Sequence, residues 1–302
     1  MQRLLRIERN TRDLERAIAF HRDALGFSVI DADASPPAWT QLPGLDAAPS
    51  RCARLGLGEQ EIEFTEFPDA APYPHGSTSC DIGFQHCAIV VSDMEAAYRR
   101  LVVEGTVPIT QGGPQQLPPA TGSVTALKFR DPDGHPLELI WFPEGTGDPC
   151  WKKPRSGNPA TLGIDHTAIS VADTGRSVLF HELVGLHVGA RGVNRGIEQQ
   201  RLDDLAGVEV DVIAMQAAAH TPHLELLGYR TPRGRVAPPA PITAVVADRV
   251  VWQAEAVDVL LEAATDGGFA DGVVASGRVR GTTIALLHDP DGHRMVLAGA
   301  AA

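Results

Sequence analysis

A glutamate stands inside an apolar strand in one of two copies of a repeated motif. The stretch FRDPDGHPLELIW, residues 129–141, surrounds Glu138 with leucine, isoleucine and tryptophan. A related stretch near the C-terminus, LLHDPDGHRMVLAG, has Val296 at the matching position. Burying a carboxylate costs free energy unless something binds it. The first copy therefore marks a place where binding chemistry is plausible, and the second a place where it has been lost.

The elements that must position such side chains recur along the chain. Asp13 opens DLERAIAFHRDALGF and Asp173 opens DTGRSVLFHELVGL, both with apolar residues at helical spacing and a following glycine. Shorter units, HCAIVVSD with MEAAYRRLVVEG and ITAVVADRVVWQ with VDVLLEAATDGG, repeat the same order of strand and helix. Each unit predicts strand, helix, strand, strand, strand.

The repeats divide the chain into two halves. The first half, 1–143, contains modules 1–67 and 82–143, and the second half, 162–302, contains modules 162–230 and 242–299. Residues 144–161 are rich in proline and glycine and are expected to form a linker.

The bulk composition excludes several classes of protein. A net charge of −12 with no basic stripe argues against nucleic acid as a partner. No apolar run reaches the length of about 18–20 residues that a membrane helix needs. The N-terminus lacks the apolar core of a signal peptide, and the four cysteines show no CxxC spacing. We expect a cytoplasmic protein, either a monomer or a homodimer, with no membrane partner.

A βαβββ unit repeated four times resembles the vicinal oxygen chelate superfamily, which includes glyoxalase I, extradiol dioxygenases and bleomycin resistance proteins. The resemblance rests on HxxxxVxD at the start of a module and DPDGxxxEL at its end, and it covers nearly the whole chain. It implies an α+β fold in which four modules form two pseudo-symmetric incomplete β-barrels with helices outside. It does not select one reaction, because the superfamily hosts several.

The resemblance also implies one metal ligand from the first strand and one from the last strand of each module. The first-strand ligand stands seven residues before the aspartate that opens the helix. The positions from the four modules in chain order are Arg6, His86, His166 and Arg249 on the first strands, and Glu63, Glu138, Glu225 and Val296 on the last strands. Strand alternation agrees, because His86 shares a face with Ala88, and His166 with Ala168.

Module pairing decides which of these positions meet. Arginine stays protonated and cannot coordinate a cation. If the second module pairs with the third, one site receives His86, Glu138, His166 and Glu225, and the other receives the arginines. Pairing of the first module with the second also occurs among relatives and would put an arginine in each site. We expect the former, and one divalent metal ion, Zn²⁺, Ni²⁺, Co²⁺, Mn²⁺ or Fe²⁺.

The resemblance implies a metal-dependent enzyme of glyoxalase I type, that is a lyase, isomerase or epimerase. It would chelate adjacent oxygens of a small-molecule substrate and move a proton alpha to a carbonyl, with Glu138 or Glu225 as general base. One alternative is an extradiol ring-cleaving dioxygenase using His86, His166 and Glu138 as its triad. The other is a non-catalytic protein that sequesters a ligand, as bleomycin resistance proteins do.

Other polar residues have simpler interpretations. His223, two residues before Glu225, is an alternative ligand. His135 and His293 follow the DPDG turns and are expected to serve turn geometry. Arg6, Glu63 and Arg249 are expected to form a salt-bridge cluster, with an anion-binding pocket as the alternative. The loop 112–122 is a candidate for substrate specificity.

Overall fold

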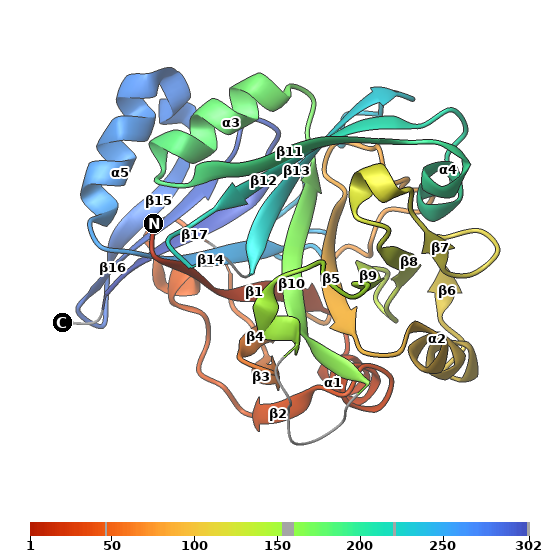
Figure 1. The fold of residues 1–302 in the computed structure, drawn as a ribbon. Coiled ribbons are helices and arrows are strands. Elements are labelled where there is room, and N and C mark those ends of the chain that lie inside the picture. The colour runs from red at the N-terminus through yellow and green to blue at the C-terminus, as the bar shows by residue number, and fades with distance from the viewer. Residues whose placement is uncertain (46, 153–159, 220–221, 301–302) are drawn as a thin grey trace.

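The computed structural model describes residues 1–45, 47–152, 160–219 and 222–300. The first and fourth modules run strand, helix, strand, strand, strand in chain order (Figure 1), as predicted. The second module has one additional two-residue strand, and the third has an additional helix. Part of the expected linker, residues 153–159, lies outside the described residues. No helix in the described ranges is long and apolar enough to cross a membrane.

The elements of the first half are, in chain order, β1 (Arg3–Thr11), α1 (Leu14–Asp23), β2 (Ser28–Asp31), η1 (Ala38–Gln41), β3 (Arg51–Leu57), β4 (Gln60–Glu66), β5 (Gln85–Val91), α2 (Met94–Val103), β6 (Val107–Pro108), β7 (Gln115–Gln116), η2 (Pro119–Thr121), β8 (Thr125–Arg130) and β9 (Pro136–Trp141). A short helical turn, η3 (Pro149–Lys152), follows.

The elements of the second half are β10 (Thr161–Ser170), α3 (Thr174–Leu183), β11 (His187–Arg195), α4 (Ile197–Asp203), β12 (Glu209–Gln216), β13 (His223–Thr231), β14 (Arg249–Ala254), α5 (Val257–Ala264), η4 (Thr265–Phe269), η5 (Ala270–Gly272), β15 (Val273–Val279), β16 (Thr282–His288) and β17 (Arg294–Gly299). The helix α4 lies between the second and third strands of its module.

Aspartate side chains fix where three of the module helices begin. Asp13, Asp93 and Asp173 are N-caps whose carboxylates accept the backbone N–H three residues later, at 2.9–3.1 Å. Such a cap satisfies one of the four free amide groups at a helix N-terminus. The fourth helix, α5, begins after Ala256 without a side-chain cap. The aspartate from which the ligand positions were counted is therefore a helix cap.

The modules pair as second with third and first with fourth. One sheet has the strand order β11-β12-β13-β10-β5-β9-β8-β6, and the other has β15-β16-β17-β14-β1-β4-β3-β2. The central contacts are antiparallel, β5 with β10 and β1 with β14. In Figure 1 the red first strand accordingly lies beside the blue β14 of the last module. Of the two pairings that the sequence left open, this arrangement keeps the histidines together.

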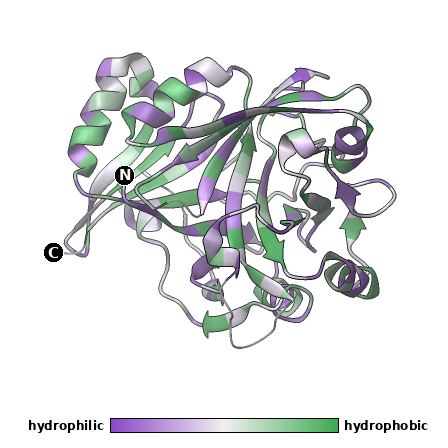
Figure 2. Ribbon diagram, in the orientation of Figure 1, coloured by the Kyte–Doolittle hydropathy of each residue, from purple (hydrophilic) through white to green (hydrophobic). Residues whose placement is uncertain are grey.

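The two faces of each sheet carry different residues. Ile7, Ile89, Ile169 and Trp252 lie in the largest hydrophobic cluster, which also contains the buried residues of the module helices. The alternate residues of the same strands, such as Ala88 and Ala168, point to the other face and belong to smaller clusters. In Figure 2 the helices carry hydrophobic and hydrophilic residues side by side, as expected of helices that cover a sheet with one face. The candidate ligands share the face of Ala88 and Ala168.

The DPDG turns join modules through their histidines. His135 Nε2 lies 2.8 Å from the backbone oxygen of Asn10, and His293 Nε2 lies 3.0 Å from that of Ser170. Gly134 has a φ of 97°, a conformation that favours glycine. Both histidines are buried, so they serve the structure of the turn and its contact with the neighbouring module.

Candidate metal centre

Four central strands place the predicted ligand positions around one point. In the antiparallel pair of β5 and β10, His86 lies opposite Ala168 and His166 lies opposite Ala88. Each of these alanines also faces the glutamate of the flanking parallel strand, Ala88 facing Glu138 and Ala168 facing Glu225. The same two-residue offset recurs in the other sheet, where Glu8 faces Glu63 and Val251 faces Val296. The register therefore confirms that Arg6, His86, His166 and Arg249 occupy equivalent positions.

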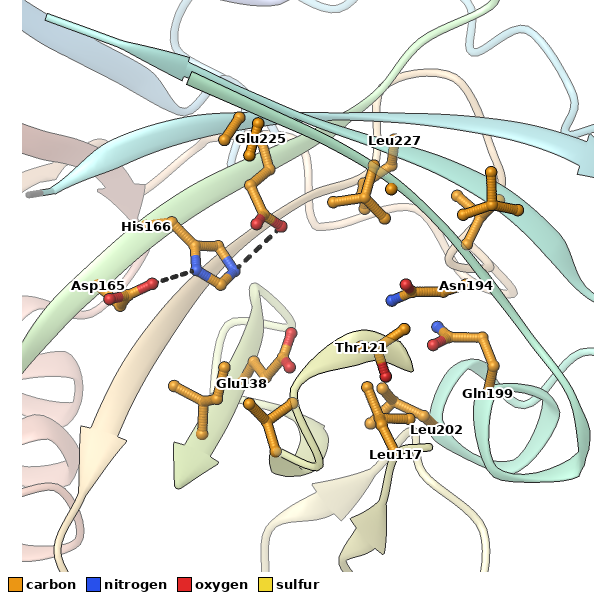
Figure 3. Close-up of a pocket in the computed structure, with 18 of the residues that line it drawn as sticks. Leu117, Thr121, Glu138, Asp165, His166, Asn194, Gln199, Leu202, Glu225 and Leu227 are labelled. Atoms are coloured by element: carbon orange, nitrogen blue, oxygen red, sulfur yellow. Dashed lines mark hydrogen bonds and ion pairs between the residues drawn. The ribbon is translucent and has the colours of Figure 1, made fainter. Parts of the chain in front are cut away.

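Three of the four predicted ligands form a tight group. His86, Glu138 and His166 each offer a ligand atom within 4.8 Å of the others, and all three are buried. The Nε2 atom of His86 lies 2.8 Å from Oε2 of Glu138. Figure 3 shows the carboxylates of Glu138 and Glu225 entering the pocket from opposite walls, with His166 beside them.

Glu225 stands at the edge of this group. Its Oε2 lies 3.5 Å from Nε2 of His166, and its Oε1 lies 3.6 Å from Nε2 of His223. His223 also belongs to a second cluster of metal-ligand type, with Asp165 and His166. The structure thus brings all four predicted residues together, and it keeps His223 within reach as an alternative to Glu225.

The surroundings of His86 fit a metal better than a hydrogen bond. The side chain is 2% exposed, and its Nδ1 has no hydrogen-bond partner within the described residues. Its Nε2 lies against the carboxylate of Glu138. Buried polar atoms are rarely left without a partner, and each exception needs an explanation. A divalent transition metal held by both side chains would satisfy the imidazole nitrogen and the carboxylate together, and two imidazoles with carboxylates suit such an ion.

The charges in the site are strongly coupled. Burial alone lowers the pKa of His166, but Glu225 and Asp165 outweigh it and raise this pKa to about 9. Burial raises the pKa of Glu225, but His166 and His223 bring it down to about 2. Burial and the nearby Lys128 lower the pKa of His86. At neutral pH the pocket therefore contains ionised carboxylates facing an imidazolium, and a metal ion would replace the proton on His166.

An aspartate next to His166 fixes the orientation of its ring. Asp165 Oδ2 lies 2.9 Å from Nδ1 of His166, and the indole of Trp151 donates a hydrogen bond to Oδ1 at 2.8 Å. When Nδ1 carries the proton that this contact favours, Nε2 keeps a lone pair for a metal. Sequence reasoning gave Asp165 no role and did not place Trp151 beside it. The DH pair at the start of the strand was the available signal, whereas Trp151 lies in the segment expected to be a linker.

A buried lysine that the sequence analysis did not single out lies on the neighbouring strand, opposite a predicted ligand. Lys128 on β8 is directly opposite Glu138 on β9. Its Nζ lies 2.6 Å from Oδ1 of Asp203, the last residue of α4. Burial lowers the pKa of Lys128, but Asp203 and Glu138 raise it overall, so the ammonium group is charged. The signal available in the sequence was a charged residue inside the apolar strand TALKF.

These side chains open into a cavity of about 310 Å³. The predicted specificity loop contributes Leu117, Ala120 and Thr121 to its wall. Asn194 and Gln199 line the same space beside Thr121, on the side away from His166 (Figure 3). The cavity is therefore large enough for a small molecule, with apolar walls and polar groups at its ends.

The equivalent position in the other sheet is filled by ion pairs. Arg6 Nη2 lies 2.7 Å from Oε1 of Glu8, and Arg6 Nε lies 3.4 Å from Oε2 of Glu63. Arg249 Nε lies 3.4 Å from Oε2 of Glu8, and its guanidinium stacks 4.1 Å above the ring of Trp39. The predicted salt-bridge cluster is confirmed, with Glu8 as its additional, central member.

Comparison with known proteins agrees with this arrangement. Residues 3–139 match the model of the Glyoxalase/Bleomycin resistance protein/Dioxygenase superfamily. This part of the chain is therefore similar in sequence to that superfamily. No curated protein matches the chain in sequence.

Several solved structures share the fold over nearly the whole chain. Glyoxalase I from Zea mays superposes with a TM-score of 0.62 at 20% identity, covering 99% of this chain and 92% of that one. A mutant of the same enzyme gives a TM-score of 0.67 at 19% identity, with the same coverage. A putative dioxygenase from Bacillus subtilis gives 0.61 at 14% identity, covering 100% of this chain and 87% of that one. At such identities the likeness establishes the fold and leaves the reaction open.

Proposed function

We propose that this chain is a metal-dependent enzyme of the glyoxalase I type. It would bind a small substrate through adjacent oxygens and transfer a proton alpha to a carbonyl. The observation that carries the proposal is the group of His86, Glu138 and His166, buried at one end of a cavity, with Glu225 in contact with it. The close approach of His86 Nε2 to the Glu138 carboxylate supports a metal at this point.

The protein's own residues would divide the work as follows. His86, His166 and Glu138 would hold a divalent metal, which when bound supplies a Lewis acid that polarises a substrate carbonyl. Glu225 is the better candidate for the general base, because it stands at the edge of the group and its side chain is more exposed than that of Glu138, 20% against 8%. Its low pKa keeps it ionised at neutral pH, which is the form that a general base requires.

The cavity walls would orient the substrate and limit access of water. Leu117, Leu202 and Leu227 surround the space in front of the ligands, and Asn194 and Gln199 offer hydrogen bonds at its far end (Figure 3). Excluding water strengthens every electrostatic interaction within the site. A substrate with two adjacent oxygens at the metal and a polar group at its other end fits this distribution.

One observation favours a second candidate, an extradiol-type dioxygenase. The tight group consists of two histidines and one carboxylate, with Glu225 outside it. This set matches the facial triad of non-haem Fe²⁺ oxygenases, which leaves positions open for substrate and O₂.

A panel assay separates the two candidates. Protein loaded with Zn²⁺, Ni²⁺, Mn²⁺ or Fe²⁺ is incubated in D₂O with 2-hydroxyketones, 2-hydroxy acids and thiohemiacetals, and loss of the α-hydrogen signal is followed by NMR. Oxygen uptake is measured in parallel with catechols. Exchange that disappears in Glu225→Gln supports the first candidate, and oxygen uptake dependent on Fe²⁺ supports the second. Tight binding of one of these compounds without turnover by any metal form would instead identify a sequestering protein.

A further inference from the structure

In both sheets a cation lies directly across the strand pair from the glutamate of the last strand. Arg54 on β3 is opposite Glu63 on β4, and Lys128 on β8 is opposite Glu138 on β9. Side chains in directly opposed positions have Cβ atoms about 4.5–5.5 Å apart, so long basic side chains reach the carboxylate. The two cations nevertheless behave differently.

In the sheet with the arginines, the opposed cation neutralises its glutamate. The Nε and Nη2 atoms of Arg54 each lie 3.2 Å from Oε2 of Glu63. Arg6 approaches the same oxygen at 3.4 Å. Glu63 is 1% exposed and is thus a buried carboxylate whose charge is met by two arginines.

In the sheet with the histidines, the opposed cation is held by a different carboxylate. Within the described residues, the Lys128 ammonium forms its ion pair with Asp203, at 2.6 Å, and none with Glu138. Asp203 is itself buried, and its Oδ2 accepts hydrogen bonds from Gln199 at 2.8 Å and from Tyr229 at 3.0 Å. The carboxylate is therefore fixed on both oxygens.

The end of α4 that carries Asp203 is anchored to the neighbouring module. The Thr110 hydroxyl donates to the backbone oxygen of Leu202 at 2.9 Å, and the Ser79 hydroxyl donates to that of Asp203 at 3.2 Å. Thr110 belongs to the second module, as do Lys128 and Glu138, and Ser79 lies in the connection just before that module.

We propose that Asp203 is a positioning residue that holds Lys128 away from Glu138 and so leaves this glutamate free to bind the metal. The inference rests on the proposed metal-dependent function. A buried charge left without its partner is strongly unfavourable, so an ammonium released by Asp203 would pair with the next carboxylate within reach. Glu138 lies directly opposite, and a lysine bound to it would compete with the metal, much as Arg54 occupies Glu63.

The test compares the Zn²⁺ affinities of four proteins by competition with a chromophoric chelator. Asp203→Asn should weaken Zn²⁺ binding by about tenfold, since an interaction of about 1.4 kcal/mol corresponds to that factor. Adding Lys128→Met to this variant should restore the affinity to within about threefold of the wild type, because the competing ammonium is gone. Asp204→Asn, the same substitution at the exposed neighbouring residue, is the matched control and should leave the affinity unchanged.

Each contrary result has a distinct meaning. Wild-type protein that binds no Zn²⁺ would overturn the proposed function itself. If Asp203→Asn binds Zn²⁺ as tightly as the wild type, the role of Asp203 alone is overturned. The same holds if adding Lys128→Met does not restore the affinity. If Asp203→Asn does not fold, Lys128→Met is compared with Lys128→Met/Asp203→Asn. Equal affinities support the proposal, and a tenfold loss in the double variant contradicts it.

Discussion

Replacing Asp165 by asparagine should weaken metal binding without removing any of the proposed ligands. Asp165 accepts two hydrogen bonds on separate oxygens, from the Trp151 indole on Oδ1 and from Nδ1 of His166 on Oδ2. An asparagine has one acceptor oxygen. One of these two N–H groups would therefore face an amide NH₂ group, which is itself a donor.

The size of the effect follows from the burial of these groups. His166 is 4% exposed and Asp165 is 7% exposed, so water cannot replace the lost acceptor. Leaving a buried donor unsatisfied costs about 1–3 kcal/mol. His166 can avoid this cost by moving its proton to Nε2, but Nε2 is then no longer available to the metal. We expect Zn²⁺ affinity to fall by about 10–100-fold, the range typical of groups that orient metal-binding histidines.

The assay is a chelator competition at pH 7.5 on wild type, Asp165→Asn and Trp151→Phe. Trp151→Phe keeps the carboxylate on His166 and removes only the donor to Oδ1, so its loss of affinity should be several-fold smaller. Far-UV circular dichroism of the metal-free proteins checks that the fold is retained. An Asp165→Asn variant that is folded and binds Zn²⁺ like the wild type would refute the proposed orientation of His166.

Three further predictions address other parts of the molecule. Glu138→Gln should reduce Zn²⁺ affinity by at least about tenfold in the same competition assay, because it removes one anionic ligand while keeping the shape. Arg249→Met should lower the free energy of unfolding in urea by about 1–3 kcal/mol, because it removes the donor to the buried Asn10 side chain and one of the two arginines that pair with Glu8. It should not change metal content, since Arg249 lies in the other sheet. Burial lowers the pKa of His21 to about 4, below its unfolded value of about 6.5, so the unfolded state binds more protons in acid. Stability should thus fall by about 3 kcal/mol between pH 6.5 and 4, and His21→Met should flatten this part of the profile measured by urea titration at each pH.

Much of the fold was predictable because the modules are repeats, so that a pattern found in one module could be compared with the same positions in the others. The aspartate caps, the DPDG turns and the seven-residue spacing recur in the sequence, and the strand register confirms that they mark equivalent positions. The choice between module pairings followed from charge, because arginine cannot serve as a metal ligand. The arginines meet Glu8 and Glu63 in one sheet, and the histidines meet Glu138 and Glu225 in the other.

The supporting residues of the site were not predictable in the same way. Asp203 reaches Lys128 from α4, an α-helix that interrupts the order of its module. The first module has only the four-residue 3-10 helix η1 at the matching place. Trp151 reaches Asp165 from beyond the last strand of the second module. No repeated motif or regular spacing in the sequence marks either contact, because both depend on how separate modules pack. A charged residue in an apolar strand, as at Lys128, shows that a partner must exist but does not identify it.

Metal content is the most direct test of the central claim. Protein purified without a histidine tag is analysed for metals by elemental analysis, next to a His86→Ala/His166→Ala variant. We predict about one equivalent of a divalent transition metal per chain in the wild type and loss of that metal in the variant. Wild-type protein that stays free of metal after incubation with excess Zn²⁺, Ni²⁺, Mn²⁺ and Fe²⁺ would contradict the account.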